Sequence, residues 1–152
     1  MKNIIIFIIL NLVFFSLSLY SAFRVRNYYY KKRGKKSQTF IEFLNNGKLP
    51  TIKNLLIGLI FGMVFGFIDN LGLWLGVDTL QKYMPGGLLS KAALGNTYSD
   101  SLGVIVGTSI SIMAKESLDY DDDSEPIWLN MVGIVIGCLM GMVAGRAITN
   151  KK

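Results

Sequence analysis

Four long apolar runs constrain this chain more than any other feature of its sequence. A bilayer core about 30 Å thick is crossed by a helix of about 20 apolar residues, and runs of this length exceed what the core of a small soluble domain needs. The last three runs also carry closely spaced glycines. The sequence therefore predicts an all-α integral membrane protein with about four transmembrane helices, one in each of these segments: Asn3 to Phe23, Asn54 to Val77, Leu88 to Ala114 and Ile127 to Ala147.

Small residues recur every four positions in the last three runs. Residues four apart lie on one face of a helix, and helices in lipid associate where small residues let their backbones approach. Three such rows favour a tight bundle, either within one chain or between copies. We expect a homo-oligomer, with the glycine row of the last run as one candidate interface. The helix-packing glycines are Gly58, Gly62, Gly66, Gly95, Gly103, Gly107, Gly133, Gly137, Gly141 and Gly145.

Basic residues are concentrated directly after the first apolar run, where nine Lys and Arg precede the second run. Basic side chains beside an apolar helix fix its orientation and contact anionic lipid headgroups. We therefore favour headgroups over nucleic acid as the partner of this segment. Thr39 and Glu42 have the spacing of a capping box and predict a short amphipathic helix there. The predicted organisation is an anchor (1–23), a basic membrane-proximal linker (24–53), a three-span core (54–147) and a tail (148–152).

The residue types present exclude several kinds of catalytic site. The chain has no histidine, and its one cysteine, Cys138, lies inside the last apolar run. Ser-His-Asp and Cys-His catalysis and histidine-ligated zinc are therefore excluded. Because no nucleophile–base set is present, we predict that the protein is not an enzyme. The only cofactor that we expect is a bound Na⁺ or Ca²⁺.

Two of the apolar runs contain carboxylates and carboxamides at depth. Asp69 and Asn70 follow Gly66 by three and four residues, and Asn96 and Asp100 are four apart, so both carboxylates border small-residue faces. A carboxylate at the bilayer centre costs about 2.5–3.5 kcal/mol on insertion scales. We expect one polar cluster between the two helices, with Asp69 and Asp100 as candidate metal ligands. The candidate cation-binding or proton-relay residues are Asp69, Asn70, Asn96, Ser99 and Asp100.

These residues leave two classes of function open. In the first, the cluster holds a hard cation or passes protons, and the protein takes part in or regulates transport of Na⁺, Ca²⁺ or H⁺. In the second, the carboxylates only clamp helices together, and the protein is a scaffold that oligomerises through glycine-rich helices. Hydrogen bonds between membrane helices are worth about 0.6–2 kcal/mol each. Because this is less than the insertion cost of the charge, we favour the first.

Three stretches of the sequence resemble the transmembrane protein 65 family: GFIDNLGLWLG, LSKAALGNTYSDSLG and VGIVIGCLMGM. The resemblance covers about residues 55 to 143. It implies three-span membrane proteins, typically of the mitochondrial inner membrane, linked to sodium-dependent calcium export and to cell-junction organisation. By motif, Asp69 and Asn70 match the family's first acid–amide pair. The second set is matched by Gly95, Asn96, Ser99 and Asp100.

Overall fold

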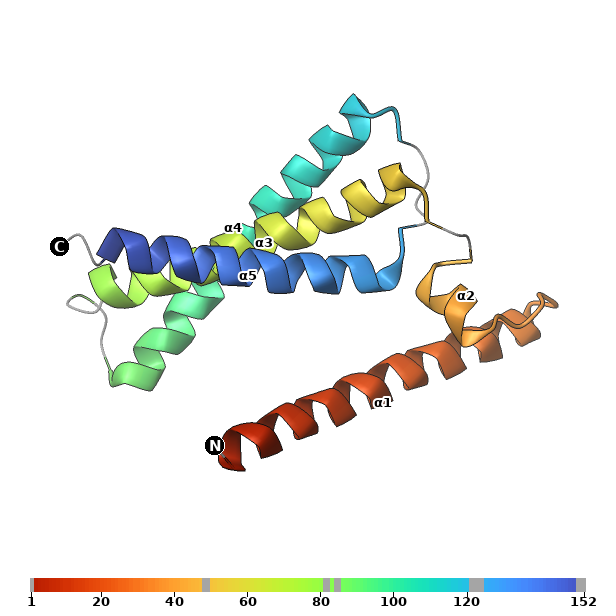
Figure 1. The fold of residues 1–152 in the computed structure, drawn as a ribbon, viewed down its shortest axis with the longest axis horizontal. Coiled ribbons are helices and arrows are strands. Elements are labelled where there is room, and N and C mark those ends of the chain that lie inside the picture. The colour runs from red at the N-terminus through yellow and green to blue at the C-terminus, as the bar shows by residue number, and fades with distance from the viewer. Residues whose placement is uncertain (1, 48–49, 81–82, 84–85, 121–124, 150–152) are drawn as a thin grey trace. The chain divides into compact units, whose positions relative to one another are not determined.

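A computed structural model describes residues 2–47, 50–80, 83, 86–120 and 125–149 of the chain. All regular structure in these residues is helical, as the sequence predicts (Figure 1). The chain divides into two compact units, Met1–Gly47 and Lys48–Lys152. The first unit contains α1 (Lys2–Lys32) and α2 (Phe40–Leu44), and the second contains α3 (Ile52–Leu80), α4 (Leu88–Ser117) and α5 (Ile127–Thr149).

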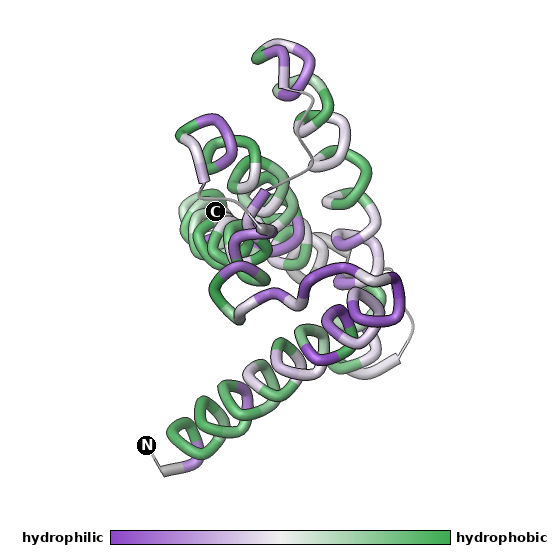
Figure 2. The backbone as a smooth tube through the Cα atoms, turned by 90° about the vertical axis from the view of Figure 1, so that its right-hand side faces the viewer, coloured by the Kyte–Doolittle hydropathy of each residue, from purple (hydrophilic) through white to green (hydrophobic). Residues whose placement is uncertain are grey.

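Three described helices are long and apolar enough to cross a membrane, which fits a multi-pass membrane protein. They are the segments Asn3–Lys32 of α1, Ile52–Gly76 of α3 and Ile127–Thr149 of α5. α4 is less apolar because it contains Asn96, Asp100 and several serines and threonines. Figure 2 shows that α1 is hydrophobic over most of its length and hydrophilic towards its C-terminal end.

The first helix continues nine residues beyond the predicted anchor, from Phe23 to Lys32. It ends in a Schellman motif, in which Gly34 adopts a φ of 67° and the Lys35 N–H donates to the Tyr30 carbonyl at 2.8 Å. Lys31 and Lys32 occupy its last turn, where the helix dipole favours positive charge. The first part of the basic linker is therefore helical and continuous with the apolar segment.

The short helix after the basic loop has the capping box that the sequence predicts. The Thr39 hydroxyl accepts from the Glu42 N–H at 3.2 Å, and the Glu42 carboxylate accepts from the Thr39 N–H at 2.6 Å. These bonds satisfy two of the backbone donors that a helix N-terminus leaves free. At the other end, Asn46 adopts a φ of 54° and terminates the helix.

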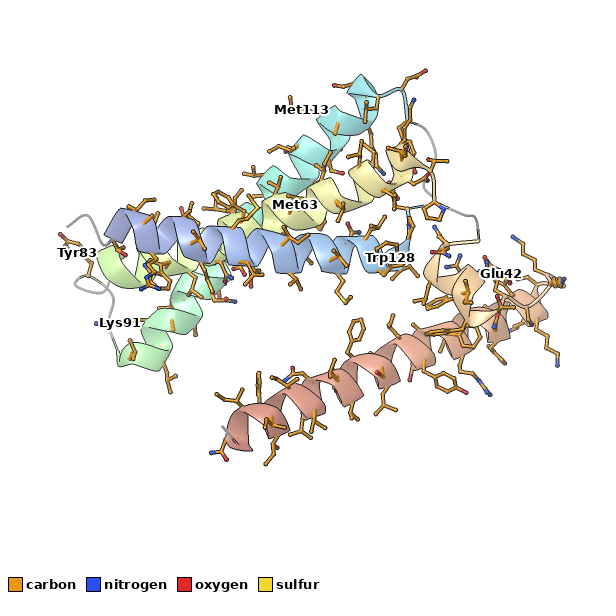
Figure 3. All side chains as sticks on the ribbon, viewed as in Figure 1. Glu42, Met63, Tyr83, Lys91, Met113 and Trp128 are labelled. Carbon is orange, nitrogen blue, oxygen red and sulfur yellow. The ribbon has the colours of Figure 1, made fainter. Side chains whose placement is uncertain are left out.

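In the second unit, α3 is the central helix and packs against both α4 and α5. α5 runs parallel beside α3, whereas α4 runs in the opposite direction and crosses α3 obliquely (Figure 1). One end of this unit holds the start of α3, the end of α4 and the start of α5, with Met113 and Trp128 near it (Figure 3). Lys91 and Tyr83 lie towards the other end. Between described residues, α4 and α5 have at most weak contact with each other.

Glycines lie on both sides of the α3–α5 contact. A Cβ atom added at Gly62 would lie 2.8 Å from the Ile134 nitrogen, and one added at Gly133 would lie 2.6 Å from the Leu59 oxygen. Gly137 and Gly141 likewise leave no room for a Cβ against the α3 backbone. The glycine row of α5 is thus covered by α3 of the same chain.

The α3–α4 contact is less tight. Gly103 and Gly107 of α4 pack against Phe65 and Phe61, where an added Cβ would lie at least 3.0 Å from any neighbouring atom. The α3 glycines divide between the two partners. Gly58, Gly62 and Gly66 face α5, whereas Gly72 and Gly76 face α4. α3 therefore offers small residues to α5 along its first half and to α4 along its second half.

Candidate functional site: a carboxylate pair between α3 and α4

Asp69 of α3 and Ser99 of α4 form the direct polar link between these two helices. The Ser99 hydroxyl donates to Oδ1 of Asp69 at 2.8 Å, and its side chain is only 1% exposed. Gly72, one turn beyond Asp69, makes this approach sterically feasible because a Cβ there would lie 2.9 Å from the Ser99 Cβ. The glycine on α3 thus positions the serine that holds the aspartate.

Asp100 follows Ser99 on the same helix and lies beside Asp69. Its Oδ2 accepts from the Asn96 carboxamide nitrogen at 2.8 Å, and the two carboxyl groups are close enough to interact. Both aspartates are half-buried, whereas Asn96 is exposed. The structure thus brings together four of the five predicted site residues, namely Asp69, Asn96, Ser99 and Asp100.

Asn70 points to a different helix. Its carboxamide nitrogen donates to the Cys138 carbonyl of α5 at 3.0 Å, and its Cβ lies close to Gly141. Consecutive helical residues differ by about 100° in direction, so Asp69 and Asn70 face the two partners of α3. Asn70 therefore ties α5 to the α3 turn that carries Asp69, instead of joining the cluster through its side chain.

Cys138 lies near the cluster from the third side. Its sulfur packs against Gly66, and its thiol is within electrostatic range of both Asp69 and Asp100. α5 is thus the third helix near the carboxylate pair. The sequence alone does not point to Cys138, because a lone cysteine in an apolar run has no pattern that indicates a partner.

An apolar groove of about 420 Å³ lies along α3. Met63, near the middle of α3 in Figure 3, contributes to its wall. The other lining residues also come from all three helices: Val64, Phe67, Ile68, Val106, Ile110 and Met140. Because every lining side chain is apolar, the groove adds no polar side chain to the carboxylate pair.

The cluster has the donor atoms that hard cations require. Two carboxylates, the Ser99 hydroxyl and the Asn96 carboxamide offer oxygen ligands, which Na⁺, Ca²⁺ and Mg²⁺ prefer. Two neighbouring carboxylates in a low-dielectric setting repel each other unless a cation or a shared proton neutralises them. The arrangement is thus suited to binding a cation or to holding a proton that can move.

A second polar cluster was not predicted. Asn54, which is 5% exposed, donates to the Tyr120 hydroxyl at 2.6 Å and caps the start of α3 through Thr51. Lys53 donates to the Leu118 carbonyl at 2.9 Å, and a Lys115–Glu125 ion pair spans 2.7 Å. The Asn54 and Lys53 bonds fasten the chain just beyond α4 to the start of α3, and the ion pair joins α4 to the residues before α5. The T-x-x-N spacing of Thr51 and Asn54 is the one sequence signal for it.

The chain matches no protein-family model, no curated protein and no solved structure. The resemblance to the transmembrane protein 65 family accordingly stays a prediction.

Proposed function

We propose that this protein binds a cation between Asp69 and Asp100 and takes part in, or regulates, the movement of Na⁺, Ca²⁺ or H⁺ across a membrane. The observation that carries the proposal is the Ser99–Asp69 hydrogen bond, which brings the half-buried Asp69 of α3 to the turn of α4 that carries the half-buried Asp100. Like charges on neighbouring helices are costly away from water, and a bound cation or a shared proton removes that cost.

The proposal includes α4 as a fourth transmembrane helix. A helix of 30 residues is about 45 Å long, which is more than the bilayer core requires. α4 packs its buried Gly95, Gly103 and Gly107 against α3, itself a candidate span. Its carboxylate and carboxamide then lie at the depth of α3 Asp69. Polar residues at such depth generally mark ion pathways or proton relays.

Small-residue packing in lipid is part of the same proposal. The close approach of Gly62, Gly133 and Gly137 to facing backbone supports association of α3 with α5 by the small-xxx-small mode. A homo-oligomer also remains part of the proposal, because three core helices are few for alternating access around a midplane site. Since α3 covers the α5 row, copies are expected to meet through another face.

Ligand-dependent thermal stability tests the proposed site. A ligand that binds only the folded state stabilises it by about 2.7 kcal/mol at 100 times its Kd. Purified protein should therefore unfold at a higher temperature as Na⁺ or Ca²⁺ is added in place of choline, or should respond to pH alone if the ion is a proton. Asp69→Asn and Asp100→Asn should abolish this response.

Asp119→Asn is the matched control, because it removes one carboxylate at an exposed position just beyond α4. Asp119 has a φ of 49°, which asparagine tolerates. The control should keep the full response. A wild-type protein whose unfolding is independent of these ions and of pH would overturn the proposal, as would an Asp100→Asn variant that responds like the wild type.

The second candidate is a non-transporting scaffold. It is favoured by the observation that each carboxylate already has a donor, Ser99 for Asp69 and Asn96 for Asp100. In a scaffold these bonds would be the whole purpose of the cluster, and neutral asparagines would serve as well. Unchanged stability and assembly in the Asp69→Asn/Asp100→Asn double variant, together with no ion response in the wild type, would favour this candidate.

A further inference from the structure

The end of α1, the basic loop and α2 form a closed hairpin within the first unit, here termed the surface hairpin (residues 24–47). Asn27 holds it together, because its carboxamide nitrogen donates to the Gln38 carbonyl and its oxygen accepts from the Gln38 N–H, both at 2.8 Å. Arg26 donates to the Asn46 side chain at 2.8 Å. Phe43, 4% exposed, packs against Phe23 with ring centroids 5.7 Å apart.

The hairpin carries an excess of positive charge. Glu42 is the only acidic residue in positions 1–47, and its carboxylate accepts from the Thr39 N–H of its own helix. Arg26 is directed inwards to Asn46 and Tyr30. The remaining basic side chains of the hairpin are exposed: Arg24, Lys31, Lys32, Arg33, Lys35 and Lys36.

Exposed apolar and aromatic side chains accompany this charge. On α2, Ile41 is 70% exposed and Phe40 is 41% exposed. Tyr28 and Tyr29 on α1 are also exposed. Basic residues combined with apolar and aromatic ones are typical of segments that lie in the membrane interface. The segment directly follows a helix long and apolar enough to span a bilayer, which would place a lipid surface next to it.

We propose that the surface hairpin docks onto anionic phospholipid headgroups of the leaflet at which α1 emerges, with Ile41 and Phe40 of α2 inserted into the interface. Charge complementarity selects this partner, since anionic leaflets attract clustered Lys and Arg close to a membrane helix. Asn27 is the positioning residue, because its two bonds to Gln38 hold the loop and α2 against α1. The inference requires α1 to be inserted, but it does not depend on cation transport.

The test measures the depth of α2 in the full-length protein reconstituted into vesicles. A spin label is attached at Ile41→Cys in a Cys138→Ser background, and its accessibility to oxygen and to a water-soluble nickel chelate is compared. Vesicles of phosphatidylcholine alone are compared with vesicles that also contain phosphatidylglycerol. The oxygen-to-nickel ratio should rise several-fold when phosphatidylglycerol is present, because the label moves into the apolar region.

Two sets of variants test the mechanism in the same background. Asn27→Leu removes both bonds to Gln38 and should lower the ratio, whereas Asn11→Leu is the matched control, since Asn11 bonds only the Phe7 carbonyl within α1. Lys35→Gln/Lys36→Gln removes charge without touching the Asn27 bonds and should reduce the dependence on phosphatidylglycerol. Membrane flotation verifies insertion of each variant.

Three results would overturn the inference in protein that is correctly inserted. One is a label at position 41 that is equally accessible to nickel in both kinds of vesicle. Another is an Asn27→Leu variant whose label remains as deep as that of Asn11→Leu. The third is an undiminished lipid response in the Lys35→Gln/Lys36→Gln variant, because it would remove charge complementarity as the cause.

Discussion

The Ser99 hydroxyl of α4 lies 2.8 Å from the Asp69 carboxylate of α3, and Ser99 is almost fully buried. This bond joins two helices that also meet where Gly103 and Gly107 pack against Phe65 and Phe61. It also holds one member of the carboxylate pair on the turn of α4 that carries the other. The contact therefore links the packing of α4 to the geometry of the candidate site.

Replacing Ser99 with alanine should destabilise the protein and disturb the site together. Asp69 would lose its donor while remaining half-buried, which costs about 1–3 kcal/mol. Thermal unfolding in detergent measures the loss, and the ion response described above should weaken in parallel. Ser101→Ala is the control, because Ser101 is exposed and bonds only the Thr97 carbonyl of its own helix. Equal effects of the two variants would contradict the assigned role of Ser99.

Gly137→Leu should disrupt folding of the single chain. A side chain at Gly137 would overlap the Met63 carbonyl, and its Cβ would lie 2.9 Å from the Phe67 nitrogen. Overpacking typically costs about 1–3 kcal/mol and should be at the upper end against rigid backbone. Thermal unfolding reports this, with the outward-facing Val143→Leu, 69% exposed, as control. If the variant were as stable as the wild type but formed smaller oligomers, the glycine row of α5 would lie between copies instead.

Tyr120→Phe should loosen the connection between α4 and α5. The variant leaves the amide of Asn54, which is 5% exposed, without the Tyr120 hydroxyl that accepts from it at 2.6 Å. The expected loss is about 1–3 kcal/mol of unfolding free energy. Tyr83→Phe serves as control, because Tyr83 is 81% exposed. A Tyr120→Phe protein as stable as Tyr83→Phe would show that this bond does not fasten the connection.

The capping box of α2 should be sensitive to acid. Thr39 lowers the pKa of Glu42 below its ordinary value of 4.5, because its backbone N–H and its side chain donate hydrogen bonds to the Glu42 carboxylate. A carboxylate with a lowered pKa contributes stability above the ordinary value, and that stability is lost as the pH falls from 4.5 through the lower folded value. The amide NMR shifts of Glu42 and Phe43 should change only in that range.

Glu42→Gln is the control for this titration. Glutamine can also close a capping box, but it does not ionise. The variant should therefore keep its α2 shifts constant over the same pH range. An acid transition of the same size in the glutamine variant would assign the change to another group.

Much of the helical architecture could be predicted from apolar runs and turn chemistry. Runs of about 20 apolar residues indicate helices of membrane-spanning length, and the capping box of Thr39 and Glu42 located α2. The end of α1 was missed because a helix need not stop where its apolar stretch stops. Arg24, Arg26 and Lys31 are compatible with a helix, which continues until Gly34 provides a left-handed residue.

The partners of each helix face were less predictable than the faces themselves. Four-residue spacing places glycines on one face, but it does not indicate that Gly66 meets α5 whereas Gly72 meets α4. For the same reason Asn70 was grouped with Asp69, although it bonds the Cys138 carbonyl of α5. The Asn27–Gln38 contact joins residues eleven apart across a turn and has no periodic signature.

Ion flux in proteoliposomes tests the central proposal most directly, with wild type compared with Asp100→Asn under an imposed gradient of Na⁺, Ca²⁺ or H⁺. The proposal predicts flux above that of protein-free vesicles for one of these ions in the wild type. It further predicts loss of that flux in Asp100→Asn and its retention in Asp119→Asn, with all three proteins equally reconstituted. Wild-type vesicles no more permeable than protein-free ones, or an Asp100→Asn protein that conducts as well as the wild type, would contradict it.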